Sequence, residues 1–312
     1  MIRTPLQLPM REAPEGALAA GTVVAAHRRH YTVSLDDGET VDCVLKGRKA
    51  VIACGDRVHV ARVEGGGAID AVLPRTNLIY RSDAFKQKLI AANVTLVIGV
   101  IAPDLPADFE LIDRWGIAAV AEGCAFLIVA NKSDLPDADR LVDRLRAWNT
   151  LGYEVLSISA RGDVSALAHR VRGEHSVLVG QSGMGKSTLL NALAPGVGAR
   201  TAEISSALSS GRHTTTETTL HRLPDDGSGG WIVDSPGMKA FGLAHLPPHV
   251  IEEAFVDIRP YLGQCRFRDC RHDREPGCAV QAAVERGEIV PHRVELLHEM
   301  VAESELVRDP SR

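Results

Sequence analysis

The chain has 312 residues, of which 45% are hydrophobic, 24% are charged and 4% are aromatic, and its formal net charge is −5. This length predicts two or three globular domains, and the charge excludes a chain that is basic throughout. No run of about 18–20 apolar residues suggests a membrane span, and the first residues lack the apolar stretch of a secretion signal. We therefore expect a cytoplasmic protein whose six cysteines do not form disulfides.

The N-terminal part of the chain predicts a small all-β barrel. Residues 1–20 contain prolines and no periodic pattern, which is typical of a flexible lead-in. After them come short segments of alternating apolar and polar residues, separated by Gly and Asp turns. Four or five short strands of this kind favour an OB-fold, which we place at residues 21–81. The clearest segments are 31–35, 40–45, 57–61 and 68–73.

A continuous apolar run at residues 94–101 marks a change of pattern. From here buried strands alternate with helices, which predicts a mostly parallel sheet with helices on both faces. We assign this α/β domain to residues 82–246 and a mostly helical domain to residues 247–312. The remaining strands are expected at 125–130, 153–158 and 176–179, and the helices at 108–122, 137–151, 163–171, 278–287 and 291–306.

A glycine-rich segment after the strand at 176–179 fits the pattern G-x-x-x-x-G-K-[ST]. In such a loop the backbone N–H groups wrap the phosphates of a nucleotide, and the following helix N-terminus adds a partial positive charge. Lys186 is expected to reach the β- and γ-phosphates during catalysis, and the Ser187 hydroxyl to bind Mg²⁺. The predicted phosphate loop consists of Gly180, Gln181, Ser182, Gly183, Met184, Gly185, Lys186, Ser187 and Thr188.

Four residues after the strand at 125–130 predict which base is bound. They are Asn131-Lys132-Ser133-Asp134, and they lie where open α/β sheets bind ligands. The Asp134 carboxylate can accept hydrogen bonds from N1–H and the 2-amino group of guanine, and adenine lacks both donors. Asn131 is expected at the O6/N7 edge of the purine and the Lys132 stem over its ring. Ser159-Ala160, after the next strand, resembles the loop that backs the guanine in GTPases.

The segment Asp234-Ser235-Pro236-Gly237 fits the pattern D-x-x-G after a short apolar strand. Asp234 is expected to hold Mg²⁺ through water, and the Gly237 N–H to sense the γ-phosphate. Residues 211–216, between this motif and the phosphate loop, predict a nucleotide-sensing switch. One threonine of 214–216 is expected to bind Mg²⁺ when GTP is bound; we assign this role to Thr215, and the sequence leaves the choice among the three open.

The residue after D-x-x-G is Met238, where Ras-like enzymes have a Gln that orients the attacking water. Methionine cannot orient a water molecule, so unaided hydrolysis is expected to be slow and to need stimulation. His213 in the predicted switch either places this water or only fixes the loop, and the sequence leaves both roles open.

The nucleotide motifs stand in a rotated order, because residues 131–134 precede the phosphate loop instead of following D-x-x-G. A sheet tolerates such a circular permutation when the original chain ends lie close together. The chain then runs from D-x-x-G directly into residues 247–312. We expect the loss of γ-phosphate contacts to be transmitted to that region.

A cysteine- and histidine-rich segment near the C-terminus predicts a metal site. Cys265, Cys270, His272 and Cys278 have the spacing C-x₄-C-x-H-x₅-C. Three thiolates and one imidazole are a complete tetrahedral set for Zn²⁺, and such a closed site is structural rather than catalytic. Buried free thiols and a redox pair are the alternatives.

Together these residues resemble the RsgA (YjeQ) family of circularly permuted GTPases. The resemblance implies an N-terminal OB-fold, a permuted GTPase core and a zinc domain, with GTP or GDP, Mg²⁺ and one structural Zn²⁺ as ligands. It also implies a factor that binds the small ribosomal subunit and its rRNA, assists late maturation, and hydrolyses GTP faster on the subunit. The matching segments are Pro74-Arg75, 131–134, 180–188, 211–216, 234–237, 241–243 and 265–280.

Two other functions remain compatible with the residues alone. The chain could be a GTPase that serves another RNA, or a switch that binds a protein partner through the barrel and the zinc domain. Basic clusters at residues 27–30 and 46–49 either contact phosphates or form a solvated surface. We expect the chain to be a monomer.

Overall fold

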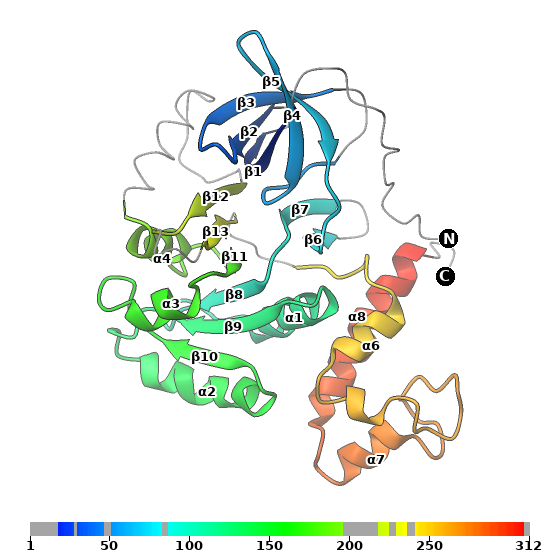
Figure 1. Ribbon diagram of the computed structural model, residues 1–312. Helices are drawn as coiled ribbons and strands as arrows, with labels where there is room; N and C mark the ends of the chain where they lie inside the picture. Colours follow the sequence, from blue (N-terminus) through cyan, green and yellow to red (C-terminus); the bar gives the residue numbers. More distant parts are fainter. Residues whose placement is uncertain are drawn as a thin grey trace.

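The structure, a computed structural model, describes residues 18–27, 30–46, 51–82, 87–195, 218–224, 229–235 and 241–308. Figure 1 shows a barrel of blue and cyan strands, a central sheet flanked by green helices, and an orange and red helical lobe. This arrangement confirms the predicted fold class of a β-barrel, an α/β domain and a mostly helical C-terminal region.

Five strands close into the N-terminal barrel. They are β1 (Ala19–His27), β2 (His30–Leu35), β3 (Thr40–Leu45), β4 (Arg57–Val63) and β5 (Gly66–Val72). Four antiparallel pairs and the parallel pair β3–β5 make a ring in the order β1-β2-β3-β5-β4 and back to β1, which is OB-like. Every second side chain points inward, so Val23, Val33 and Ile69 form the core. β1 begins at Ala19, inside the expected lead-in, because Ala19 pairs with Val60 of β4.

A hairpin that the sequence did not predict joins the barrel to the central sheet. It consists of β6 (Leu78–Ser82) and β7 (Gln87–Ala92), and it buries Ile79 and Ile90. The Asn77 side chain fixes its base by donating to the carbonyls of Val94 and Glu122. Its strands have only five and six residues and show no regular alternation of apolar and polar residues, which explains why the pattern gave a weak signal.

The central sheet has five parallel strands and one antiparallel edge strand. Its order is β10 (Glu154–Ser157), β9 (Ala125–Ala130), β8 (Leu96–Ile101), β11 (His175–Val179), β13 (Trp231–Asp234) and β12 (Thr218–Arg222). The connecting helices are α1 (Phe109–Ala121), α2 (Ala138–Thr150), α3 (Ser165–Arg170) and α4 (Lys186–Leu193). From β8 the chain moves toward β10, and from β11 it moves toward β13. Right-handed crossovers in opposite directions place α1 and α2 on one face and α4 on the other, with a topological switch point between β8 and β11.

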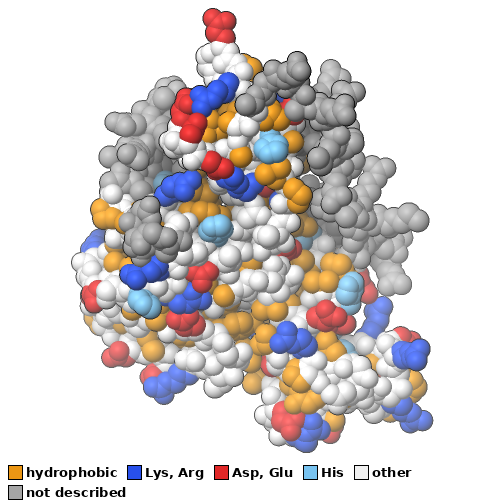
Figure 2. Space-filling view, viewed as in Figure 1, with side chains coloured by type: hydrophobic (Ala, Val, Ile, Leu, Met, Phe, Trp, Pro, Cys, Tyr) orange, Lys and Arg blue, Asp and Glu red, His pale blue; other side chains and the backbone are white. Residues whose placement is uncertain are grey.

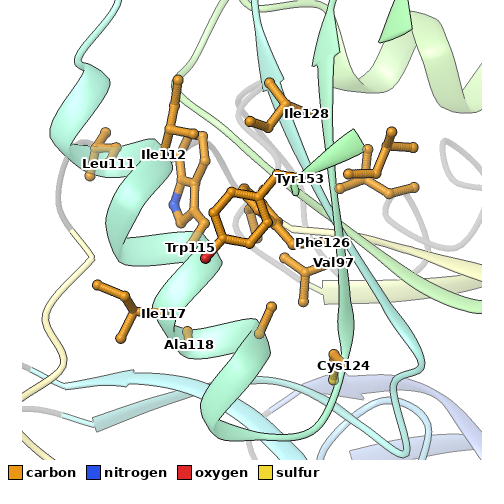
Figure 3. Packing of buried hydrophobic residues seen from close by; sticks show 14 of the residues in the cluster. Val97, Leu111, Ile112, Trp115, Ile117, Ala118, Cys124, Phe126, Ile128 and Tyr153 are labelled. Carbon is orange, nitrogen blue, oxygen red and sulfur yellow. The ribbon is translucent and has the colours of Figure 1, made fainter. Parts of the chain in front are cut away.

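A large hydrophobic core holds α1 against the sheet. Figure 3 shows Trp115 and Ile112 of α1 packed toward Phe126 of β9 and Tyr153, which precedes β10. The rings of Phe126 and Tyr153 meet edge to face at a centroid distance of 5.3 Å. The continuous apolar runs of β8 and β9 are buried because helices or neighbouring strands cover both sides.

The barrel and the central sheet are hydrogen-bonded into one eleven-stranded sheet. β1 pairs with β12 at Ala25–Thr219 and Ala26–Thr218, and the buried Cys54 thiol donates to the Thr218 carbonyl at 3.1 Å. The sequence did not predict β12, which follows residues 196–217 outside the described part of the chain. The edge of the central sheet is therefore covered by the barrel.

The C-terminal lobe packs on α1 through α6 (Pro248–Ala254) and α8 (Pro291–Arg308), while α7 (Ala279–Glu285) lies farther from the sheet (Figure 1). A buried ionic network reinforces this contact. The Arg293 guanidinium of α8 donates to Asp113 of α1 at 2.5 Å and to Asp257 at 2.9 Å. Trp148 of α2 donates to Asp113 at 2.9 Å, so the network joins three helices. None of the helices within the described ranges is both long and apolar enough to cross a bilayer.

Candidate functional site

The predicted phosphate loop lies at the topological switch point, between the end of β11 and the start of α4. Its backbone requires glycine at two positions. Gly180 has φ +153°, and a Cβ there would lie 2.5 Å from the Val100 carbonyl oxygen of β8. Gly185 has φ +93°, and a Cβ there would lie 2.2 Å from the Asn131 side-chain amide. Side chains at these positions would push the loop away from its neighbours, because neither contact has room for a methyl group.

Lys186 and Asp234 face each other at the mouth of this loop. The Lys186 ammonium donates to the carbonyls of Gly180 and Gln181, at 2.8 and 3.0 Å. The Ser187 hydroxyl donates to Asp234 Oδ2 at 3.3 Å. Burial lowers the pKa of Lys186 and raises the pKa of Asp234, although each charge favours the ionised form of the other.

Asp234 fits the role of a cation-binding group. The residue is buried, and in the described part of the chain no donor reaches its Oδ1. A buried carboxylate oxygen without a partner is costly unless a cation or water completes it. With the Ser187 hydroxyl beside it, this hard-oxygen pair suits Mg²⁺.

The predicted base-binding residues come together in the loops that follow β9 and β10. Asn131 is almost fully buried, and its amide donates to the Met184 carbonyl at 2.9 Å while its oxygen accepts from the Ala160 N–H at 3.0 Å. This side chain therefore ties the phosphate loop to the 159–160 loop, a role beyond the predicted contact with the purine edge. Asp134 is exposed, and a hydrogen bond from Ser159 is the main cause that lowers its pKa.

Lys132 lies between these two parts of the site. Its backbone has φ +64°, which is uncommon for a residue other than glycine. Its ammonium donates to both carboxylate oxygens of Asp104, at 2.9 and 2.6 Å, and to the Gly183 carbonyl at 2.8 Å. Asp104 follows the carboxyl end of β8 and belongs to none of the motifs recognised in the sequence.

One open cavity of about 780 Å³ contains both ends of the predicted site, and nucleotide-sized ligands occupy cavities of this size. Predicted residues that line it are Asn131, Lys132, Asp134, Ser159, Ala160, Ser182, Gly183, Gly185, Lys186, Ser187, Thr188 and Asp234. Residues that the sequence analysis missed are Lys88, Asp104, Leu135, Arg161 and Ser235. Most of the missed residues directly follow a predicted motif or a sheet strand, and that position is the signal that could have found them.

The remaining predicted positions behave differently. Gly180, Gln181 and Met184 shape the loop without lining the cavity: the Gln181 carbonyl accepts from Lys186, and Met184 is buried in the core. His213, Thr215 and Gly237 lie outside the described residues.

The four predicted metal ligands form a second site in the C-terminal lobe. Their ligand atoms all lie within 4.8 Å of one another. His272 Nδ1 is 3.5 Å from the sulfurs of both Cys265 and Cys278, and these two sulfurs are 3.9 Å apart. A zinc tetrahedron with Zn–S of about 2.3 Å and Zn–N of about 2.0 Å has S–N edges near 3.5 Å and S–S edges near 3.8 Å. The donor set and its spacing fit Zn²⁺.

The start of α7 supports this cluster. Backbone N–H groups of Ala279 and Gln281 donate to the sulfurs of Cys265 and Cys278, each at 3.4 Å. The Gln281 side chain donates to the His272 carbonyl at 2.6 Å, which holds the ligand in its left-handed backbone conformation of φ +62°. Hydrogen bonds of this kind orient the ligands and stabilise thiolate charge at a helix N-terminus.

Comparison with known sequences matches the region that holds the nucleotide motifs. A protein-family model described as RsgA GTPase matches residues 72–244. The chain is similar to the small ribosomal subunit biogenesis GTPase RsgA of Nitrosomonas europaea, with 44% identity over 291 residues, or 92% of each chain. The protein of the same name from Burkholderia pseudomallei is 44% identical over 317 residues, covering 99% of this chain and 100% of that protein.

Two solved structures are similar over nearly the whole chain. YjeQ from Thermotoga maritima has a TM-score of 0.70 and 32% identity, with 93% of this chain and 99% of that chain covered. YloQ, described as a circularly permuted GTPase, has a TM-score of 0.67 and 24% identity, covers 95% of this chain and 98% of that chain, and supports the fold. With its motifs in permuted order around one cavity, this chain belongs to the RsgA GTPase family.

Proposed function

We propose that this chain is a GTP-hydrolysing factor that binds the small ribosomal subunit and assists its late maturation. The observation that carries the nucleotide part is the single cavity shared by Asp134 and the phosphate loop, although their order in the chain is swapped. The partner is inferred from relatives at 44% identity whose names state small ribosomal subunit biogenesis. We place the factor in the cytoplasm, as a monomer.

In this proposal the base end of the cavity selects guanine. Asp134 accepts from N1–H and the 2-amino group, and Ser159 keeps its carboxylate ionised and oriented. Asn131 uses one amide hydrogen for the Met184 carbonyl and has a second hydrogen for N7 of the purine. The Ala160 loop backs the ring. An adenine nucleotide would leave the Asp134 carboxylate without donors, which costs binding free energy.

At the other end Lys186 exchanges the carbonyls of Gly180 and Gln181 for the β- and γ-phosphate oxygens. Charged acceptors make stronger hydrogen bonds with an ammonium than neutral carbonyls do, so this exchange is favourable. Ser187, Asp234 and Thr215 would hold Mg²⁺, which supplies positive charge to the phosphates. Gly237 would sense the γ-phosphate.

His213 is proposed to position the attacking water, because Met238 follows the D-x-x-G motif and cannot do so. Hydrolysis is then slow until a partner stimulates it. A His213→Ala protein whose subunit-stimulated turnover equals that of the wild type would assign this step to another group.

The metal cluster and the barrel are proposed to present the RNA-binding surfaces. Cys265, Cys270, His272 and Cys278 hold one structural Zn²⁺, which staples a loop with little core of its own. Figure 2 shows Lys and Arg side chains at the outer edge of the lower right lobe, where Figure 1 places α7. In this loop the Arg266 guanidinium lies 5.6 Å from the ring of the exposed Phe267, a cation–aromatic pair suited to stacked bases. The exposed arginines of the loop are Arg266, Arg268, Arg271 and Arg274.

Co-sedimentation with purified small ribosomal subunits tests the partner. With a non-hydrolysable GTP analogue we expect binding that falls steeply between 50 and 200 mM salt, roughly tenfold or more, because phosphate contacts release counterions. Arg268→Glu should weaken binding, whereas Arg146→Glu, an exposed arginine of α2, should not. Tight guanine-nucleotide binding without any subunit binding would favour another RNA or a protein partner.

A further inference from the structure

The strongest feature that no nucleotide motif explains is the contact of Asp104 with Lys132. Asp104 lies in the loop after β8, between Pro103 and Pro106, and its two carboxylate oxygens accept from the Lys132 ammonium at 2.9 and 2.6 Å. Because proline fixes its own φ angle, this loop has few alternative conformations. Asp104 is therefore held in place before any ligand arrives.

The same ammonium also donates to the Gly183 carbonyl of the phosphate loop at 2.8 Å. Leu105, next to Asp104, packs against this loop as well, since a Cβ on Gly183 would lie 2.8 Å from Leu105 Cδ1. Lys132 thus connects three loops that follow β8, β9 and β11. Its left-handed backbone is maintained by these partners, because an ordinary side chain does not favour that conformation.

The negative charge of Asp104 indicates that this residue positions Lys132 rather than attracting the nucleotide. Asp104 and Lys132 both line the nucleotide cavity, and their side chains are 41% and 26% exposed. A carboxylate beside a nucleotide triphosphate repels it weakly, so this aspartate does not serve simple electrostatic capture. A lysine stem that is anchored at its far end, in contrast, is held in one position where it lines the cavity.

We propose that Asp104 is a positioning residue that slows nucleotide release by holding Lys132 over the base and against the phosphate loop. This inference rests on the proposed guanine-nucleotide function of the cavity. Without Asp104 the ammonium keeps only the Gly183 carbonyl, and the stem becomes free to swing toward solvent. An ion pair with this exposure is worth a factor of about three to five in an equilibrium constant.

The test is the dissociation rate of a fluorescent GDP analogue from the full-length protein, measured by displacement with excess GDP at 150 mM salt. This salt concentration screens the weak repulsion between Asp104 and the phosphates. Asp104→Ala is expected to release the analogue about three- to fivefold faster, with little change in the association rate. Asp104→Glu keeps the charge and should restore the rate to within about twofold. Asp104→Asn serves as a second variant without the charge.

The matched control is Asp108→Ala, because Asp108 is an exposed aspartate of the same loop whose side chain caps nothing and does not line the cavity. It should release the analogue at the wild-type rate. In a Lys132→Met background, which keeps the stem and removes the ammonium, Asp104→Ala should have no further effect. If Asp104→Ala instead loosened the loop in general, its effect on the release rate would add to that of Lys132→Met.

Unchanged release by both Asp104→Ala and Asp104→Asn, or additive effects with Lys132→Met, would overturn the inference. If the proposed guanine-nucleotide function itself were wrong, a different result would be seen. In that case the wild-type protein itself would hold ADP as tightly as GDP, whatever residue stands at position 104.

Discussion

The nucleotide site and the metal site of this protein are built in opposite ways. The nucleotide cavity collects side chains from β7, from the start of α4 and from the loops after β8, β9, β10, β11 and β13, which are spread from Lys88 to Ser235. The metal cluster takes all its ligands from one stretch between Cys265 and Cys278 and accepts hydrogen bonds from the first turn of α7. The cavity therefore depends on the whole sheet, whereas the cluster depends on one short loop and the helix start beside it.

Because of this difference, we expect that disrupting one site leaves the other intact. No metal ligand lines the nucleotide cavity, and no cavity residue belongs to the metal cluster. The two regions meet where α6 and α8 pack on α1, and Arg293 of α8 is paired with Asp113 of α1 there. Loss of one site should reach the other only through this contact or through the chain segment between Asp234 and α6.

The largest expected effect comes from removing the metal. Removal of zinc by a zinc-selective chelator in excess Mg²⁺, or Cys278→Ala, should unfold the cysteine loop and α7, because a structural zinc supplies about 10 kcal/mol or more of folding free energy to such a region. Hydrogen exchange should show lost protection in α7, while calorimetry should find GDP affinity within about twofold of the wild type. A parallel collapse of GDP affinity would show that the two sites are not independent.

The next largest effect should come from Arg293→Met, which tests the contact between the two regions. The substitution keeps the apolar stem and leaves Asp113 and Asp257 as neighbouring buried carboxylates without their partner. Breaking a buried ion pair in this way costs about 3–5 kcal/mol, which urea unfolding would measure. Arg146→Met is the control, because its ion pair with Asp143 is exposed and should contribute little. If the two variants had equal free energies of unfolding, the buried network would not stabilise the contact between the two regions.

Asp134→Asn should change the nucleotide site without affecting the metal cluster. The amide cannot accept from both guanine donors as a carboxylate does, so GDP affinity should fall by about two orders of magnitude or more. Xanthine has a carbonyl where guanine has its 2-amino group, and the new amide can donate to it, so XDP should bind the variant better than GDP. Calorimetry with GDP, XDP and ADP measures both changes, and metal content should stay at the wild-type level. Unchanged GDP affinity would remove Asp134 from the base site.

The smallest expected effect is a pH dependence at the junction between the hairpin and the C-terminal lobe. His245 stacks on Tyr80 of β6 with ring centroids 3.8 Å apart, and burial lowers its pKa to about 4. The unfolded chain, with a histidine pKa near 6.5, binds the proton more readily, so stability is constant above about pH 6.5 and falls as the pH drops toward 4. Between pH 7 and pH 5 this group should cost about 2 kcal/mol.

His245→Phe keeps an aromatic ring on Tyr80 and removes the titration. The difference in unfolding free energy between pH 7 and pH 5 should therefore shrink by about 2 kcal/mol relative to the wild type. His292→Gln, at the exposed start of α8, is the matched control and should keep the wild-type dependence. An unchanged pH slope in His245→Phe would place the acid sensitivity elsewhere.

Several features of the fold were predictable because they depend on local patterns. The apolar runs at 94–101 and 125–130 became β8 and β9, and the segment at 40–45 became β3. The hairpin of β6 and β7 and the edge strand β12 were missed, since they are stabilised by the surfaces on which they pack. β12 in particular owes its place to pairing with both β13 and β1, which are far apart in sequence.

The amino-acid sequence by itself determined which chemical groups are available: a glycine-rich loop before a helix, an Asn-Lys-Ser-Asp segment after a buried strand, and three cysteines with a histidine at close spacing. Its periodicity also predicted the buried strands and the helices of the central domain, because these patterns act over a few residues. Only the tertiary structure decided that Asp134 and Ser187 share one cavity, that Asn131 spans two loops, and that Asp104 anchors Lys132. Such contacts depend on which strands become neighbours in the sheet, and that choice is made by packing of the whole domain rather than by any single segment.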